Sequence, residues 1–326
     1  WMMWNWLLSS LYFGSTVVLY EGSPFYPQKD NILKLVDTEN VNIFGTSAKY
    51  ISYLQSENMI PDEKYRFKNL RLILSTGSTL THENFDYVYN NIKSDVQLSS
   101  ISGGTDIISC FALGNPMSEV RRGELQCIGL GMDVDSYNLE GKSIKNQKGE
   151  LVCKSPFPSM PISFWNDKGS KKYYQSYFSK YENIWTHGDF IEINSAGGVI
   201  VYGRSDATLN PGGIRIGTAE IYSAISELAY IEDSIAVNSA DGDSYFLFVK
   251  LYGKKNLSDS LLKEIKLKIR DNLSPKHIPS EIISVSDIPY TINGKKVEIA
   301  VKKIIEGEEI ENLDSLSNPQ CLNEYH

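Results

Sequence analysis

The first hundred residues alternate between short apolar runs and amphipathic segments. Apolar residues lie on one side of the expected helices 30–39 and 82–93, and three of the apolar runs, at 42–45, 70–75 and 96–101, lead into turns of Gly, Ser and Thr. This alternation predicts a βαβ arrangement, an α/β fold in which ligands gather at the carboxyl ends of the strands. The predicted helices are 1–13 (expected to be buried), 30–39, 47–57 and 82–93, and the predicted strands are 16–20, 42–45, 70–75 and 96–101.

After residue 123 the pattern changes to short β segments separated by Gly and Asn turns. A smaller unit begins after Asp206, in which Ser258 is placed to cap a helix. The acidic stretch 306–314 predicts a solvated tail. The short β segments are 124–128, 136–138, 150–153, 190–194 and 198–202; the smaller unit has a predicted helix at 219–228 and strands at 234–238, 245–251 and 281–286.

Composition and charge limit the kinds of partner that the chain can have. Its 326 residues are enough for two domains, and 41% hydrophobic with 22% charged residues is an ordinary globular balance. A net charge of −8 argues against a nucleic-acid partner, whereas a nucleotide needs only a few well-placed cations. None of the cysteines forms a C-x-x-C pair, so reduced, structural thiols in a cytosolic protein are predicted for Cys110, Cys127, Cys153 and Cys321.

The first twenty residues carry no charge and have about the length of a membrane span. Polar residues interrupt them and no basic flank precedes them, so a core helix is favoured over a membrane span or a signal peptide. The chain does not begin with Met and its first residues already have a core-like composition. These features predict a fragment whose N-terminus lies upstream of Trp1.

The segment 203–221 holds two arginines, two acidic residues and four glycines, and apolar spacing is poor until Ile214. Glycine lets a ligand approach the main chain, and the planar guanidinium of arginine suits phosphate and diol oxygens. A loop of this composition can bind an anion. From composition alone, a charged interdomain turn with paired arginines is the favoured alternative.

The order of residues in this loop resembles the most diagnostic motif of the adenylate-forming superfamily. The resemblance rests on Gly203-Arg204-Ser205-Asp206, Gly213-Ile214-Arg215 and Glu220-Ile221. The superfamily includes acyl-CoA synthetases and the adenylation domains of peptide synthetases. Its members join a carboxylate to AMP and then usually to a thiol, so the resemblance implies ATP, Mg²⁺ and CoA as cofactors.

Two polar turns at predicted strand ends resemble the superfamily's nucleotide contacts. Gly104-Thr105-Asp106 is similar to the motif whose hydroxyl contacts the α-phosphate and whose acid supports Mg²⁺; the family more often has Glu where Asp106 stands. The resemblance also implies a catalytic role for Thr105. The turn Gly77-Ser78-Thr79 is similar to the adenine-contacting turn, although a plain loop is equally compatible with its residues.

Two further motifs carry implied roles in the ribose site and in catalysis. Thr186-His187-Gly188-Asp189 resembles the motif whose acid accepts hydrogen bonds from both ribose hydroxyls, and Arg204 is implied beside it. Pro289 to Lys296 resembles the segment that carries the catalytic lysine, which falls on Lys295. Without the other motifs, a solvated Asn-Gly hairpin would be the favoured interpretation of this last segment.

The resemblance also implies a domain organisation. Residues 1–205 correspond to the C-terminal portion of the large domain, with a βαβ sheet and a small β-barrel-like subdomain, and 206–326 to a small mobile α+β domain. The hinge falls at Asp206. Gly212 and Gly213 are implied in the CoA tunnel, and Arg215 near the phosphate or the CoA path.

Within the superfamily the narrower resemblance is to the acetoacetyl-CoA synthetases, in segments such as 209–213, 288–297 and 317–319. Gly103 supports it, because acetate-specific relatives carry a tryptophan there that shortens the acyl pocket. The predicted substrates are acetoacetate, ATP and CoA. Two alternatives remain open: a medium- or short-chain acyl-CoA synthetase, and a truncated, non-catalytic remnant, since no stretch resembles the family's phosphate loop, which is expected before Trp1.

Overall fold

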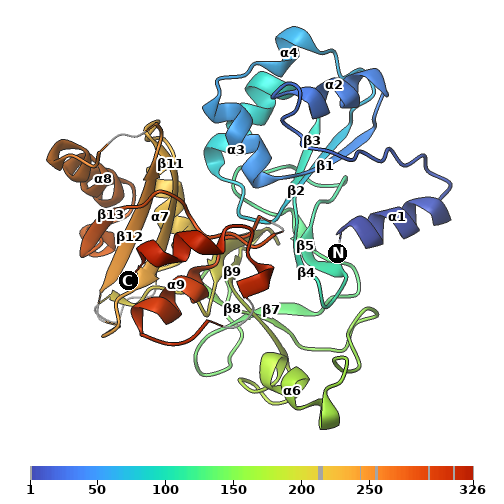
Figure 1. The fold of residues 1–326 in the computed structure, drawn as a ribbon. Coiled ribbons are helices and arrows are strands. Elements are labelled where there is room, and N and C mark those ends of the chain that lie inside the picture. The colour runs from blue at the N-terminus through green and yellow to red at the C-terminus, as the bar shows by residue number, and fades with distance from the viewer. Residues whose placement is uncertain are drawn as a thin grey trace. The chain divides into compact units, whose positions relative to one another are not determined.

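The computed structural model describes residues 2–211, 216–242, 244–253, 256–292, 294–310 and 313–325, without the side chains of residues 2–4. These residues form two compact units (Figure 1). The first consists of residues 1–187 with 191–201, and the second of 188–190 with 202–326. No helix of the described residues is both long and apolar enough to cross a membrane.

A parallel three-stranded sheet, in the order β1-β2-β3, organises the first part of the first unit. Helices α2, α3 and α4 lie around these strands in Figure 1. The hydroxyl of Ser47 accepts a hydrogen bond from the backbone N–H of Tyr50, so it caps α3 as the sequence predicts. The elements are β1 (Ile43–Ser47), β2 (Leu72–Thr76), β3 (Gln97–Ser100), α2 (Asn31–Thr38), α3 (Ala48–Ser56), α4 (Pro61–Lys64) and α5 (His82–Tyr87), which continues as a π-helical turn, Val88–Ile92.

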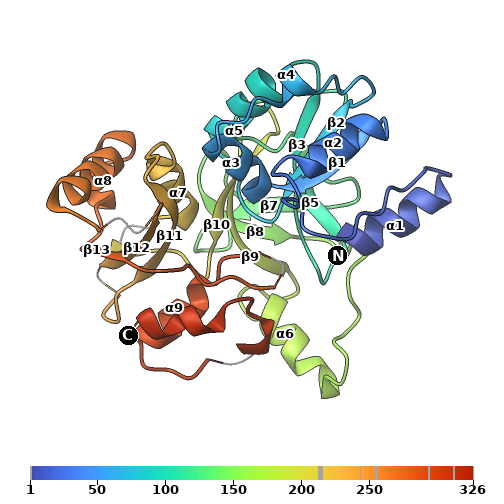
Figure 2. The ribbon, with the colours of Figure 1, turned by 45° about the horizontal axis from the view of Figure 1, so that its top comes forward.

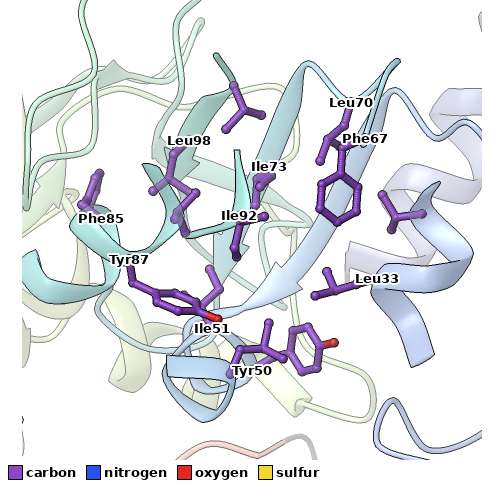
Figure 3. Packing of buried hydrophobic residues seen from close by; sticks show 14 of the residues in the cluster. Leu33, Tyr50, Ile51, Phe67, Leu70, Ile73, Phe85, Tyr87, Ile92 and Leu98 are labelled. Atoms are coloured by element: carbon purple, nitrogen blue, oxygen red, sulfur yellow. The ribbon is translucent and has the colours of Figure 1, made fainter. Parts of the chain in front are cut away.

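One hydrophobic core joins this sheet to its helices. Figure 3 shows Ile73, Ile92 and Leu98 within that core. Each of these three side chains is at most 3% exposed. The burial of Ile73 and Leu98 fixes which faces of β2 and β3 point into the core. Because the strands are parallel, their carboxyl ends lie at the same edge of the sheet.

Two further sheets hold the remaining strands of the first unit. Short parts of two of their strands, residues 188–190 and 202–204, belong to the second unit. One has the order β4-β5-β6 and the other β10-β9-β8-β7. Aromatic residues of α6 (Lys171–Tyr177), β5 and β9 pack in a shared core. The strands are β4 (Ser102–Gly104), β5 (Ser109–Leu113), β6 (Cys127–Ile128), β7 (Val134–Tyr137), β8 (Gly149–Cys153), β9 (Trp185–Ile193) and β10 (Val199–Arg204).

The second unit is built on the three-stranded sheet β11-β12-β13, in which β11 is antiparallel and β13 parallel to β12. Alternating residues of β11 enter two different cores, one with α7 and α8 and the other with α9. Figure 2 shows these helices on opposite sides of the strands. The elements are α7 (Thr218–Ile225), β11 (Ile231–Asn238), β12 (Tyr245–Leu251), α8 (Asp259–Asn272), β13 (Glu281–Ser284) and α9 (Glu298–Ile305).

Two predictions about the first residues are wrong. Helix α1 (Met2–Tyr12) forms as predicted but is not buried, since Leu8, Leu11 and Tyr12 are 57%, 63% and 86% exposed. No described element covers these side chains. The predicted strand at 16–20 is irregular, because it has no hydrogen-bonded partner strand among the described residues.

Candidate functional site

The predicted adenine turn lies at the carboxyl ends of neighbouring parallel strands. The Thr76 hydroxyl donates to the carbonyl oxygen of Ile101 at 3.1 Å, and the Ile101 N–H donates to the Ser75 carbonyl at 2.9 Å. Gly77 follows with φ of +93°, a conformation that favours glycine. Ser78 and Thr79 are exposed. The structure therefore places this turn beside the segment that leads into the predicted phosphate motif.

The predicted phosphate motif is the exposed turn between β4 and β5. The Ile108 N–H donates to the Thr105 carbonyl oxygen at 3.2 Å, which leaves the Thr105 and Asp106 side chains at the surface. The Tyr177 hydroxyl of α6 donates a hydrogen bond to Asp106 Oδ2. The Tyr177 ring stacks on Trp185, with ring centroids 3.7 Å apart. Sequence reasoning missed Tyr177, because nothing in its surroundings except a run of tyrosines marks it.

Asp106 fits a magnesium ion of the kind that is bound together with a substrate. Within the described ranges, no group of three His, Cys, Asp or Glu residues could hold a metal ion. Mg²⁺ at nucleotide sites, however, takes only one or two carboxylates and completes its shell with phosphate oxygens and water. An exposed carboxylate whose second oxygen is already fixed by Tyr177 suits that arrangement.

The two glycines before Thr105 have structural reasons of their own. A Cβ at Gly103 would lie 2.0 Å from the Ser109 carbonyl oxygen on β5, so the close approach of the two backbones requires glycine there. A Cβ at Gly104 would lie 2.9 Å from Cε1 of His187 on β9. The adenine turn, the phosphate turn and His187 are thus neighbours in the first unit. The role of Gly103 in the acyl pocket stays a prediction.

The second unit gathers the predicted ribose residues. Arg204 Nη1 lies 3.5 Å from Asp189 Oδ1. Asp206 holds the same guanidinium through two hydrogen bonds, of 3.1 Å to Nε and 2.8 Å to Nη2. A Cβ at Gly188 would lie 2.7 Å from Arg204 Nη2, so this glycine makes room for the arginine. Asp206, the predicted hinge, is therefore also an ionic partner of Arg204.

The carboxyl group of Asp189 has a pKa above its usual value. Its side chain is only 13% exposed. Burial raises its pKa to about 6, and Asp206 contributes to the rise, while the positive charges of Arg204 and Lys295 oppose it. Because the Asp189 carboxylate is already mostly shielded from water, it loses little further hydration when a ligand binds. It is therefore suited to accept hydrogen bonds from the two hydroxyls of a diol.

Lys295 follows a tight turn between two hairpin arms. The Thr291 N–H donates to the Lys295 carbonyl at 2.8 Å, and the Gly294 N–H donates to the Thr291 carbonyl at the same distance. The Lys295 side chain is exposed. Among the described residues, none makes an ion pair or hydrogen bond with its ammonium group. Its neighbour Lys296 is instead held by three contacts in the interior of the unit.

Three predicted site residues, Gly212, Gly213 and Arg215, lie outside the described residues. The four cysteines are free thiols, as the sequence predicts. Burial raises the pKa of Cys110 and of Cys321 to about 11, so neither thiol is activated as a nucleophile.

Comparison with known proteins identifies the fold. No family model matches the chain. The benzoate CoA ligase from Burkholderia xenovorans, at 20% identity, matches with a TM-score of 0.72 over 90% of this chain and 57% of its own. The chain thus has the fold of the C-terminal part of an adenylate-forming ligase.

Within that class the chain is similar along its whole length to acetoacetyl-CoA synthetases. The enzyme from Streptomyces lividans superposes with a TM-score of 0.93 at 40% identity, over 100% of this chain and 51% of its own. The acetoacetyl-coenzyme A synthetase of Rhizobium meliloti is 48% identical over 324 residues, which are 99% of this chain and 50% of the relative. The chain spans about half the length of the curated relatives it matches.

Proposed function

We propose that the chain forms part of an ATP-dependent acid–thiol ligase that makes acetoacetyl-CoA from acetoacetate, ATP and CoA. The observation that carries this proposal is the similarity of the whole of this chain to about half the length of the acetoacetyl-CoA synthetases, together with the ordered motifs in both units. A cytosolic location is part of the proposal, in keeping with the four free thiols.

The proposed reaction consists of two half-reactions, formation of an acyl-adenylate and formation of a thioester. A carboxylate oxygen of acetoacetate attacks the α-phosphorus of ATP, an O–P bond forms, and pyrophosphate leaves. The sulfur of CoA then attacks the carbonyl carbon, a C–S bond forms, the thiol proton passes to solvent, and AMP leaves with the bridging oxygen.

We assign roles to the residues of the first unit from their exposure and chemistry. Ser78 and Thr79 contact the adenine, and Thr105 hydrogen-bonds the α-phosphate. Asp106 would hold Mg²⁺, which when bound neutralises phosphate charge. Through its hydrogen bond to Oδ2, Tyr177 would hold the Asp106 carboxylate in one orientation and leave Oδ1 for the ion.

The charged residues of the second unit act on the ribose and on the reacting groups. Asp189 accepts hydrogen bonds from the ribose hydroxyls, and Arg204 supports it. Lys295 supplies the positive charge that stabilises the oxygens of the carboxylate and the α-phosphate as they react. We propose Asp206 as the hinge between the two half-reactions, with Gly212, Gly213 and Arg215 serving the second one.

The test uses the longest natural polypeptide that contains this chain, here termed the parent polypeptide. It receives Mg·ATP and CoA with acetoacetate, acetate, butyrate or octanoate, and AMP release is followed. Strong preference for acetoacetate supports the proposal. Preference for another acid keeps the reaction and rejects the substrate. Nucleotide binding without AMP release from any acid favours a non-catalytic remnant.

A further inference from the structure

The two adjacent lysines of the hairpin have different surroundings. Lys295 is exposed, and no described residue forms an ion pair or hydrogen bond with its ammonium group, although its charge acts on the pKa of Asp189. Lys296 is 23% exposed, and its ammonium lies 2.6 Å from Asp233 Oδ1 and donates to the Ser234 carbonyl oxygen at 2.7 Å. A solvated pair of lysines would not be divided in this way.

An aromatic ring completes the site around Lys296. Its ammonium lies 4.0 Å from the centre of the Tyr222 ring on α7. The Tyr222 hydroxyl donates to Glu298 Oε1 at 3.0 Å and accepts from the Ala236 N–H at 3.1 Å. Burial and the charge of Glu298 raise the pKa of Tyr222 well above its usual value, so this hydroxyl stays protonated.

These contacts fix one arm of the hairpin to β11 and α7. Lys296 is bridged to Tyr290 on the opposite arm. Successive side chains of an extended arm point to opposite sides, so holding Lys296 inward directs Lys295 outward. The other arm is held separately, because the Ile292 N–H donates to the Ser315 carbonyl oxygen at 2.9 Å.

We propose that Lys296 is a positioning residue for Lys295, which it holds in register through Asp233 and Tyr222. The proposal rests on the proposed function, in which Lys295 acts in the first half-reaction. A lysine with a long flexible stem gains most from such support, because small displacements of a catalytic charge lower the rate strongly.

The chain offers a matched control in Lys250 on β12. Its side chain is 26% exposed and pairs with Glu232 at 2.7 Å and Asp287 at 3.1 Å, so it resembles Lys296 in burial and ionic partners. It lies outside the hairpin. Lys250→Met and Lys296→Met should therefore destabilise the second unit to a similar degree.

The experiment measures two rates in the parent polypeptide: acetoacetate-dependent ATP–pyrophosphate exchange, and thioester formation from supplied acetoacetyl-AMP and CoA. Lys296→Met should lower kcat for exchange about 10- to 100-fold and leave thioester formation within about twofold. Lys296→Arg should restore part of the exchange, because it keeps the charge over Tyr222. Lys250→Met should leave the ratio of the two rates unchanged.

Equal effects of Lys296→Met and Lys250→Met on that ratio would overturn the inference and leave Lys296 a structural residue. Lys295→Ala separates this failure from that of the proposed function. If Lys295→Ala abolishes exchange while Lys296→Met does not, only the positioning role is wrong. If Lys295→Ala leaves exchange intact, the proposed role of Lys295 fails and the inference fails with it.

Discussion

The two units present their predicted site residues in different chemical forms. In the first unit they are glycines and hydroxyls on exposed turns, with Asp106 as an accessible carboxylate. In the second they are charges: Asp189 is mostly buried, Arg204 is held between two acids, and Lys295 extends from a fixed hairpin. The first set suits recognition of a base and a metal-bound phosphate, and the second suits stabilisation of charge. Changes at Lys295 should therefore affect rate, whereas changes in the first unit and at Asp189 should affect nucleotide or metal affinity.

The largest expected effect comes from Lys295→Ala in the parent polypeptide. Removing one preorganised charge should lower acetoacetate-dependent ATP–pyrophosphate exchange about 10²- to 10³-fold. Thioester formation from supplied acetoacetyl-AMP should change little, because that step needs no charge at the α-phosphate. If Lys295→Ala lowered both rates to the same extent, Lys295 would not act specifically in the first half-reaction.

Next in size are the metal contacts of the first unit. Asp106→Asn should weaken Mn²⁺ binding in the presence of ATP about 100-fold, and Tyr177→Phe about tenfold, as measured by electron paramagnetic resonance. Tyr174→Phe is the control, since Tyr174 lies on the same helix and is 51% exposed. If the Tyr177 and Tyr174 variants bind Mn²⁺ equally, the hydrogen bond to Asp106 has no part in holding the ion.

A smaller effect is expected at Asp206. Asp206→Pro should lower thioester formation about tenfold more than pyrophosphate exchange, because a hinge must change its backbone dihedrals between the two halves. Asp206→Asn removes the negative charge that is hydrogen-bonded to Arg204 without restricting the backbone. It should lower both rates alike. Equal losses in the proline variant would reject the hinge.

An effect of similar size is expected in the pH dependence of nucleotide binding. If the diol binds ionised Asp189, whose pKa is about 6, affinity for AMP should be about tenfold weaker at pH 5 than at pH 7.5. Isothermal titration calorimetry of wild type and Asp189→Asn checks this, and the variant should lose the dependence. The same dependence in both proteins would assign it to another group, such as a histidine.

The raised pKa of Asp189 also affects stability. Moving it from 3.8 to about 6 corresponds to a cost of at most about 3 kcal/mol in the ionised state. The folded protein then binds more protons than the unfolded chain between these values, so stability falls as pH rises through this window. Asp189→Asn should therefore raise the free energy of unfolding at pH 7, and the gain should vanish near pH 4.

Local signals in the sequence predicted much of the fold. Ser47 and Ser258 cap helices as expected, and β12 has the predicted bounds, because capping and alternation depend on neighbouring residues. Helices α6 and α9 were not predicted, because only their packing in the two hydrophobic cores shows which of their residues are buried. Helix α1 was predicted to be buried but is exposed, because an apolar composition alone does not determine whether another element packs against a helix.

In the candidate site too, local motifs identified some residues and only tertiary contacts identified others. Asp106, Asp189, Arg204 and Lys295 could be singled out because they stand in ordered motifs. Tyr177 could not, because it lies 71 positions from Asp106 along the chain. The position after Lys295 also carries a lysine, and only the tertiary contacts of Lys296 distinguish this partly buried, ion-paired lysine from the exposed Lys295.

The most direct test of the central claim follows the oxygen of the substrate. The parent polypeptide is given Mg·ATP, CoA and acetoacetate labelled with ¹⁸O in its carboxylate, and the products are analysed by mass spectrometry. Attack of the carboxylate on the α-phosphorus predicts one ¹⁸O atom in each AMP formed and none in pyrophosphate. Label in pyrophosphate or phosphate, or unlabelled AMP formed together with acetoacetyl-CoA, would contradict the account.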